Sequence, residues 1–321
     1  MLGAGVVKIK NNSQHKSVLI DEVSSFLSPY NSKGIYIDAT VGGGGHAEKI
    51  LESSCPSGRL IGIDIDPLML RISAGRLQKF KQRCLLVESN YTELAQILEK
   101  HNIGEIDGAV FDLGVSTEHF KQAERGFSLT EDGPLDMRLS PRTKINAFHI
   151  VNEWPEKDLA NILWKYGEEK QARRIARHIV RKRKETKIMT TGQLRDLIAG
   201  KIGGRRGKRV HPATKSFQAL RIAVNDELDN IETVLPIVID RLKPGGRICV
   251  ISFHSLEDRL VKTCFKRLAR GCICPPEVVE CRCQNRPKIK LITGKPVRPK
   301  GEELAVNPRA RSARLRVAER V

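Results

Sequence analysis

A run of glycines between an apolar segment and a helix-like segment is the first feature that could do chemistry. Residues 35–41 are mostly apolar, Gly42 to Gly45 follow, and His46–Leu51 has the composition of a helix. Glycine lets the backbone approach a ligand that a Cβ would push away, and the first N–H groups of a helix attract negative charge. Asp64 ends the next apolar segment nineteen residues after Gly45, a spacing that suits a carboxylate bound to ribose hydroxyls. The pattern predicts a site for a nucleotide-like cofactor.

The glycine turn does not by itself choose the cofactor. Gly42, Gly44 and Ala47 also satisfy the G-x-G-x-x-G/A pattern, so nicotinamide and S-adenosylmethionine both remain open. Asp112 ends a later apolar segment and is predicted to lie beside the cofactor, because ligands gather at the carboxyl ends of parallel strands. Methyl transfer to nitrogen or oxygen needs an aligned lone pair and a proton acceptor, a role that suits Asp112. A structural carboxylate that caps the next segment is the alternative.

Short apolar segments that alternate with helix-like segments indicate which elements carry these residues. Strands are predicted at 35–37, 60–65, 84–87 and 109–115, with helices at 46–52, 67–80 and 92–100. This order is typical of an α/β fold with a doubly wound, mostly parallel sheet. The strand pattern resumes at 247–253, after a helix over 226–242 and a turn at 243–246. We therefore predict an inserted helical substrate-recognition domain (116–210) within a discontinuous catalytic domain (1–115 and 211–321).

Positive charge is concentrated in two segments of the 321-residue chain. The net charge is +19, with 15 Lys/Arg against 2 Asp/Glu in residues 170–209 and 11 against 3 in residues 284–321. Basic segments on a near-neutral core are typical of proteins that bind polyanions, with a merely solvated basic surface as the alternative. In the first segment, apolar residues recur at helical spacing. The opposite face carries the candidate RNA-binding residues Arg173, Arg174, Arg177 and Arg181.

Four of the eight cysteines, Cys272, Cys274, Cys281 and Cys283, lie within twelve residues. Four thiols could bind zinc, but the usual knuckle is C-x₂-C rather than C-x-C. A loop with reduced thiols is the other interpretation, and we assign no metal ligand from the sequence.

No segment approaches about 18 uninterrupted apolar residues, and the first residues lack a signal-peptide pattern. These features predict a cytoplasmic protein without membrane contact.

Motifs along most of the chain carry a family resemblance. They are His15-Lys-Ser-Val-Leu19, Gly42-Gly-Gly-Gly-His46, Asp112-Leu-Gly-Val-Ser116, Arg125-Gly-Phe-Ser128, Asp132-Gly-Pro-Leu-Asp-Met-Arg138, Tyr166-Gly-Glu168, Phe217-Gln-Ala-Leu-Arg221, Ser252-Phe-His-Ser-Leu-Glu-Asp-Arg259, Asn307-Pro-Arg309 and Arg311-Ser-Ala313. From His15 to its end, the chain resembles the bacterial ribosomal RNA small subunit methyltransferase H family, also called MraW. The resemblance implies a class I S-adenosylmethionine-dependent methyltransferase that modifies N4 of a cytidine in the decoding region of 16S ribosomal RNA.

The resemblance also implies the site residues. Its cofactor-binding positions correspond to Gly44, Gly45, His46, Asp64, Tyr91, Asp112 and His119. The family commonly has Phe in place of Tyr91 and Gln in place of His119, and an imidazole replaces only one of the two functions of an amide. Four residues after the fifth strand are candidates for binding the cytosine: His254, Ser255, Glu257 and Asp258. Packing and helix capping would equally explain Ser255 and Asp258.

Two residues are the predicted catalytic groups: Asp112, which would orient the cytosine amine, and His254. The predicted partner is 16S ribosomal RNA within the small ribosomal subunit or a late precursor, and a second copy of the chain is a further candidate. Two other functions compete with methyl transfer. An RNA-binding assembly protein would bind without turnover, whereas a nicotinamide oxidoreductase would leave the basic segments unexplained.

Overall fold

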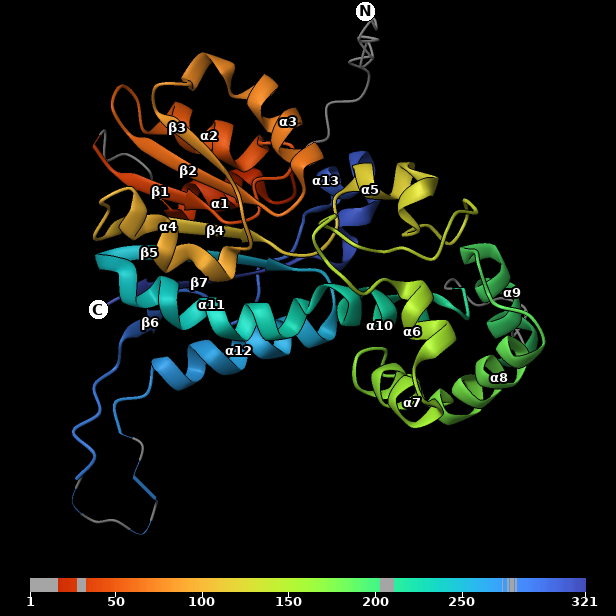
Figure 1. Cartoon of the computed structure of the whole chain (residues 1–321). Helices are drawn as coiled ribbons and strands as arrows, with labels where there is room; N and C mark the ends of the chain where they lie inside the picture. The colour runs from red at the N-terminus through yellow and green to blue at the C-terminus, as the bar shows by residue number, and fades with distance from the viewer. Residues whose placement is uncertain are drawn as a thin grey trace, which may run out of the picture.

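A seven-stranded sheet forms the centre of one part of the molecule (Figure 1). The computed structural model describes residues 17–27, 33–202, 211–272, 274–275, 277, 280 and 282–321. The strand order is β3-β2-β1-β4-β5-β7-β6, and the first five of these strands are parallel while β7 is antiparallel to both of its neighbours. The strands are β1 (Ile35–Asp38), β2 (Arg59–Asp64), β3 (Cys84–Glu88), β4 (Ile106–Asp112), β5 (Leu242–Ser252), β6 (Ile289–Leu291) and β7 (Arg314–Arg320). The predicted mostly parallel α/β sheet is confirmed.

Both faces of the sheet are buried, because successive side chains of a strand point to opposite sides. In β4, Ala109 and Phe111 belong to one apolar core, and Val110 belongs to the core on the other face. The first core includes α4 (Leu94–Lys100), α11 (Glu227–Arg241) and α12 (Ser255–Leu268), and the second includes α1 (Ile20–Leu27) and α2 (Gly45–Ser53). The remaining elements of this part are α3 (Pro67–Arg76), η1 (Gln78–Phe80), η2 (Tyr91–Glu93), α13 (Gly301–Val306) and η4 (Pro308–Ser312).

A third apolar core lies in the helical part of the chain, which Figure 1 shows beside the sheet. Its buried side chains extend from Phe127 to Val224. The elements here are α5 (Thr117–Lys121), η3 (Ala123–Arg125), α6 (Ala147–Glu153), α7 (Glu156–Lys165), α8 (Ala172–Glu185), α9 (Thr191–Ile202) and α10 (Thr214–Asn225). The division at residue 210 stays a prediction, but α10 contributes its buried side chains to the core of the insertion.

Two predicted strands have different ends in the structure. β4 covers Ile106–Asp112 rather than 109–115, because the chain turns out of the sheet at Gly114, whose φ is +95°. β5 begins at Leu242, where a turn was predicted at 243–246. Its pairing with β4 shifts there, so that residues 243–246 lie opposite the single residue Asp107. The predicted turn is thus an irregularity within a longer strand.

The helix predicted over 67–80 also differs, since α3 ends at Arg76 and the short helix η1 follows it. The amphipathic helix predicted in the insertion is confirmed as α8. Its buried side chains are Ala172, Ile175, Ala176 and Ile179, and the four arginines named above are exposed. In the described part of the chain, we find no helix with the length and apolar character that crossing a membrane requires.

Candidate active site

Three carboxylates meet where the strand order reverses. Asp38, Asp64 and Asp112 end β1, β2 and β4, and β1 pairs with both of the other strands. In a doubly wound sheet, the strands on either side of this reversal leave a crevice at their carboxyl ends, where ligands bind. The sequence predicted Asp64 and Asp112 at this edge. It missed Asp38, although a polar residue at the end of an apolar strand is the same signal.

The glycine turn is held against Asp64. Gly42 and Gly44 have φ of +48° and +79°, a region that favours glycine, and Gly44 precedes the first turn of α2. The Gly42 N–H donates to Asp64 Oδ2 at 2.9 Å, and the Asp66 N–H donates to Oδ1 at 2.9 Å. Burial raises the pKa of Asp64, although these two N–H groups oppose the rise. Each carboxylate oxygen has two lone pairs, so Asp64 can still accept hydrogen bonds from a diol.

His46 lies between Asp38 and Asp112 beneath the turn. Its side chain is buried, and Nε2 lies 3.7 Å from Asp112 Oδ2. Burial lowers the pKa of His46, but the Asp112 and Asp38 carboxylates raise it, and the net change is upward. Burial raises the pKa of Asp38 to about 7. The Asp112 N–H donates to Thr40 Oγ1 at 2.7 Å, which fixes the end of β4 against the turn.

Several atoms of this cluster have no hydrogen-bond partner among the described residues: Asp38 Oδ2, His46 Nδ1 and Nε2, and Asp112 Oδ1. Buried polar atoms are nearly always paired in native proteins, so unpaired ones at a crevice indicate a place where a ligand binds. The carboxylates suit a cation, and the N-terminus of α2 suits an anion. A Cβ on Gly45 would lie 2.1 Å from Ser17 Oγ, so a larger residue at this position would have to displace the Ser17 side chain. These features fit the ammonium, sulfonium and carboxylate groups of S-adenosylmethionine.

Tyr91 forms an aromatic side of the same edge. It begins η2 directly after β3 and its ring meets Phe111 edge to face, with centroids 5.7 Å apart. Burial, with smaller contributions from Glu227 and Glu257, raises the pKa of the Tyr91 hydroxyl. The phenol therefore stays neutral at physiological pH, and Tyr91 offers a flat apolar surface.

His119 uses both of its ring nitrogens within the protein. Nδ1 accepts the Ser116 N–H at 3.0 Å, and Nε2 lies 2.8 Å from Asp66 Oδ2. Arg125 contacts the same Asp66 oxygen at 2.9 Å. Burial would raise the pKa of Asp66, but its partners lower it to about 2. The Asp66–Arg125 ion pair thus joins the end of β2 to the start of the insertion. The only sequence signal for Asp66 was its place before Pro67, which is typical of a residue that caps a helix.

The residues after β5 form a second buried polar group. His254 caps α12, and its Nε2 lies 3.2 Å from Glu257 Oε1. Burial raises the pKa of Glu257, but His254 and Arg221 lower it overall. Glu227, His254 and Glu257 lie close enough together to bind a metal ion. However, Arg221 donates to both carboxylate oxygens of Glu227 at 2.8 Å, so this carboxylate already has a cationic partner. The pairing of Arg221 with Glu227 had no signal in the sequence, because it depends on how α10 meets α11.

Two other candidates of this segment make structural contacts. Ser255 Oγ donates to Glu168 Oε2 at 2.6 Å. Asp258 accepts from Arg316 Nε at 2.7 Å and from Arg314 Nη1 at 2.9 Å, which ties α12 to β7. The packing and capping interpretation therefore accounts for both residues.

A cavity of about 690 Å³ lies in the helical part of the chain, and Arg309 of η4 also lines it. Three aromatic side chains line it, Phe120, Phe127 and Phe217, together with the basic Lys121 and Arg309. The Arg309 guanidinium lies over the Phe120 ring, 5.0 Å from its centroid. Phe127 also contacts His119, with ring centroids 5.4 Å apart, and so connects the cavity with the edge of the sheet. Aromatic and cationic groups of this kind suit an unstacked base.

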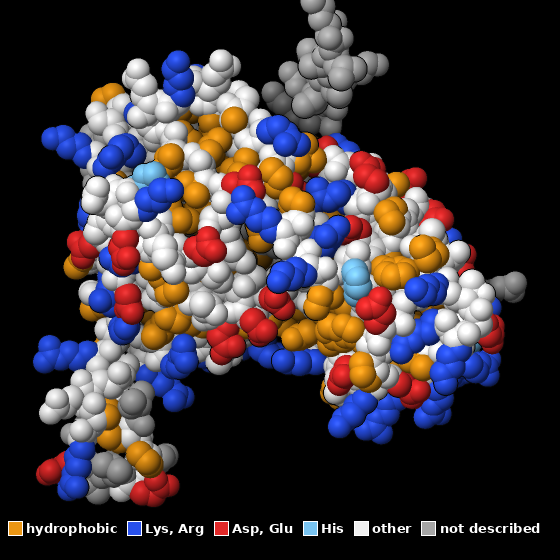
Figure 2. Space-filling model, in the orientation of Figure 1, with side chains coloured by type: hydrophobic (Ala, Val, Ile, Leu, Met, Phe, Trp, Pro, Cys, Tyr) orange, Lys and Arg blue, Asp and Glu red, His pale blue; other side chains and the backbone are white. Residues whose placement is uncertain are grey.

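The exposed arginines of α8 lie on the far side of the insertion. Figure 2 shows Lys and Arg side chains gathered over this part of the molecule. Arg177 forms an ion pair with Glu156 at 3.6 Å, whereas Arg174 donates to the neutral Gln171 side chain at 3.1 Å. Arg183, in contrast, donates to the carbonyls of Val151 and Trp154 and holds α8 against α6.

The strand order, the glycine turn after β1 and the acids at the strand ends define a class I methyltransferase, whose cofactor is S-adenosylmethionine. The chain belongs to the MraW methylase family, whose model matches residues 12–321. The predictions of fold class, family and cofactor are thereby confirmed.

Relatives match the chain over nearly its whole length. It is 49% identical over 310 residues to the ribosomal RNA small subunit methyltransferase H of Syntrophus aciditrophicus, with 96% of this chain and 98% of that protein covered. It is 50% identical over 308 residues to the protein of the same name from Geotalea uraniireducens, with the same coverage. Similar solved structures include an rRNA methylase from Streptococcus thermophilus, at 12% identity and a TM-score of 0.42, covering 96% of this chain and 99% of that chain.

Proposed function

We propose that this protein transfers a methyl group from S-adenosylmethionine to N4 of a cytidine in 16S ribosomal RNA. The observation that carries the proposal is the buried group of Asp38, His46 and Asp112, whose unpartnered atoms lie at the crevice of a methyltransferase sheet. The relatives named above are ribosomal RNA methyltransferases of the small subunit, and they cover the chain nearly completely. A ribosomal RNA substrate would place the enzyme in the cytoplasm.

The edge of the sheet would hold each group of the cofactor. The N–H groups of Gly45 and His46 would bind its carboxylate, because they open α2. The Gly44 N–H already donates to the Val41 carbonyl at 2.7 Å, so Gly44 would border the carboxylate through its backbone alone. Asp64 would accept hydrogen bonds from the ribose hydroxyls, and Tyr91 would lie against the adenine. When bound, S-adenosylmethionine supplies an electrophilic methyl group on a positively charged sulfur.

His119 would border the cofactor with its ring rather than with a nitrogen, because both nitrogens already contact Ser116 and Asp66. Its replacement of the family's usual Gln then matters less for hydrogen bonding to the cofactor than for the position of Asp66. We therefore assign His119 to the cofactor site as a positioning residue.

Asp112 would act on the acceptor amine. Conjugation with the ring makes the N4 lone pair of cytosine poorly available, so the site must favour a less planar nitrogen. Asp112 Oδ1, which has no partner among the described residues, would accept an N4 hydrogen and turn the lone pair toward the methyl group. As N4 forms its new bond, it becomes more acidic, and Asp112 would take the proton and release it to water. His254, which lies just after β5, would help to hold the cytosine base.

RNA would bind across both parts of the chain. Neither groove of an A-form helix offers N4 to a deep pocket, so the target base must be unstacked. We propose that it passes the aromatic cavity on its way to Asp112, while Arg173, Arg174, Arg177 and Arg181 contact phosphates elsewhere on the RNA. In this proposal residues 116–210 recognise RNA, and α10 packs with them.

The test is transfer of labelled methyl groups by the full-length protein to small ribosomal subunits, to late precursor particles and to naked 16S ribosomal RNA. Nucleoside analysis of the product should find N4-methylcytidine at one position. Binding of the particles without transfer would instead support an assembly protein.

Calorimetry should detect S-adenosylmethionine binding and no binding of NAD, and the reverse would support an oxidoreductase. Sedimentation of the active protein would show whether two copies associate.

A further inference from the structure

An arm between α12 and β6 is not used by the proposed methyl transfer. The chain leaves α12 at Leu268 and returns to the sheet at Ile289, and Figure 1 shows this segment extending away from the rest of the molecule. None of the described residues from Arg270 to Lys288 is buried. Hydrogen bonds hold the base of the arm: Asn285 Nδ2 donates to the Arg270 carbonyl and the Lys288 N–H donates to the Leu268 carbonyl, both at 2.8 Å. The described residues of the arm therefore form no apolar core of their own.

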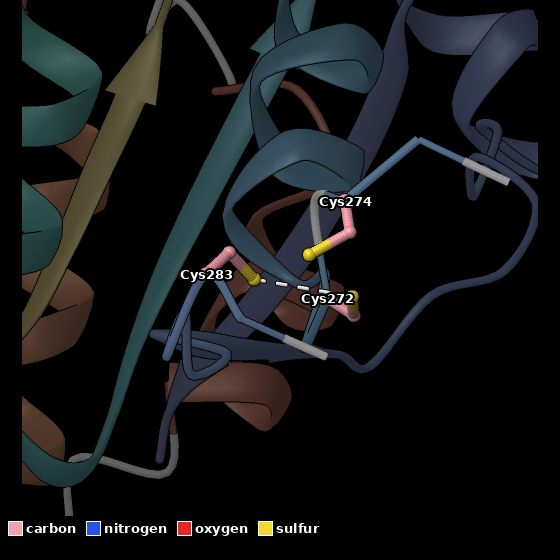
Figure 3. A group of neighbouring side chains, drawn as sticks. All are labelled: Cys272, Cys274 and Cys283. Carbon is pink, nitrogen blue, oxygen red and sulfur yellow. Dashed lines mark hydrogen bonds between the residues drawn. The ribbon is translucent and has the colours of Figure 1, made fainter. Parts of the chain in front are cut away.

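Three cysteines meet within this arm. The Sγ atoms of Cys272, Cys274 and Cys283 lie within 4.8 Å of one another, and Figure 3 shows the three side chains turned toward a common point. The Sγ atoms of Cys272 and Cys283 are 3.9 Å apart. A tetrahedral zinc site with Zn–S bonds of about 2.3 Å separates its sulfur atoms by roughly 3.8 Å. The Cys272–Cys283 distance matches this spacing, and Cys274 lies close enough to both sulfur atoms to join them around one ion.

We propose that Cys272, Cys274 and Cys283 bind a Zn²⁺ ion that fixes the fold of the arm. Thiolates are soft ligands that select zinc among the divalent ions common in proteins, and zinc needs no redox partner. Each thiol releases its proton to water when the metal binds. Three thiolates and Zn²⁺ carry a net charge of −1. Residues 270–288 carry four Lys/Arg against two Glu, so the arm has a net charge of +2 that would offset it.

A bound metal ion would stabilise the fold of the arm, as an apolar core stabilises the rest of the protein. Segments too small to bury a core are commonly held by metals or disulfides, and metal binding then supplies the folding free energy. Because the ion sits in the arm, its removal should loosen the arm and leave the sheet and the cofactor site folded. Cys281 of the same sequence cluster lies outside the described residues, and we assign it no role.

The test uses the full-length protein, reduced and stripped of metal, titrated with Co²⁺ and then with Zn²⁺. We expect one Co²⁺ per chain, with the intense visible absorption of cobalt bound tetrahedrally by thiolates, and displacement by Zn²⁺. Cys272→Ser, Cys274→Ser and Cys283→Ser should each weaken binding on the order of 100-fold, since each removes one ligand from a site of this strength. Cys55→Ser is the matched control, because Cys55 is also exposed and lies outside the arm.

Two further measurements keep the proposal open to refutation. Zn²⁺ should protect the arm from protease in the wild-type protein and give no protection in the triple serine variant. S-adenosylmethionine binding should be the same in both, which separates a loss of the metal from a loss of the fold. The proposal is overturned if the wild-type protein shows no thiolate–cobalt absorption, if the triple serine variant keeps it, or if the purified chain contains a Cys272–Cys283 disulfide and no metal.

Discussion

Replacing Asp112 with Asn is the sharpest test of the proposed mechanism. Asn has nearly the same size, and the backbone N–H of residue 112 should keep its 2.7 Å contact with Thr40 Oγ1, so the edge of the sheet should remain folded. The substitution removes a negative charge 3.7 Å from His46 Nε2. It also turns one carboxylate oxygen into an NH₂ group, which cannot accept a hydrogen from the cytosine amine.

The expected loss follows from these contacts. Removal of an acid–base group typically lowers a rate by about 10² to 10⁴. Asn keeps one carbonyl oxygen that can accept a hydrogen bond, so we expect the lower end, roughly 10²-fold, or about 2.7 kcal/mol of activation free energy. Burial lowers the pKa of His46 and the Asp112 carboxylate raises it, so Asp112→Asn should move the His46 titration to lower pH.

The rate should be measured in a single turnover with both substrates saturating, because slower chemistry is then separated from weaker binding. The position of the His46 titration is measured by NMR. Asp240→Asn is the control, since Asp240 is a half-exposed carboxylate that pairs with Lys288 on the surface, and its rate should equal that of the wild type. A near-normal rate for Asp112→Asn, with an unmoved His46 titration, would refute the role of Asp112 in transfer and leave it as a cofactor ligand.

Three further predictions concern the cofactor, the RNA and the pH dependence of stability. Asp64→Ala should weaken S-adenosylmethionine binding by about 10- to 100-fold, as expected for hydrogen bonds to a charged acceptor, and unchanged calorimetric affinity would contradict the ribose assignment. Changing Arg173, Arg174 and Arg177 to Glu should weaken RNA binding and flatten its salt slope by about 0.7–0.9 per lost phosphate contact, with cofactor affinity unaltered. The pKa of Asp66 is about 2 in the folded protein and 3.8 otherwise, so its ionised form stabilises the fold above pH 4, and this contribution should disappear as the pH falls to 2. In acid unfolding measurements Asp66→Asn should lack this component, and parallel pH curves for the two proteins would contradict it.

The cofactor side of the site was predictable from the sequence because its signals are local. An apolar run, a glycine turn and a helix occur within twenty residues, and a strand that is buried on both faces is visible in the sequence as a short continuous apolar run. The same holds for α8, whose apolar and arginine faces follow from helical spacing alone. Strand ends were less certain, because they depend on backbone turns such as that at Gly114 and on the irregular pairing of residues 243–246 with β4.

The sequence by itself determined the first five strands and the helices between the first four, the glycine turn, the acids at the ends of β2 and β4, and the basic face of α8, since short-range patterns encode each of them. It did not predict β6 and β7, which complete the sheet. Only the tertiary structure decided that Asp38, His46 and Asp112 share one buried group, because β4 pairs with β1 and not with β3, its predecessor in the chain. It likewise decided the Arg221–Glu227 pair, the packing of α10 with the insertion, and the meeting of three cysteines in the arm. The physical reason is that burial and contact between distant segments depend on how the sheet and the helices pack, which local propensity does not specify.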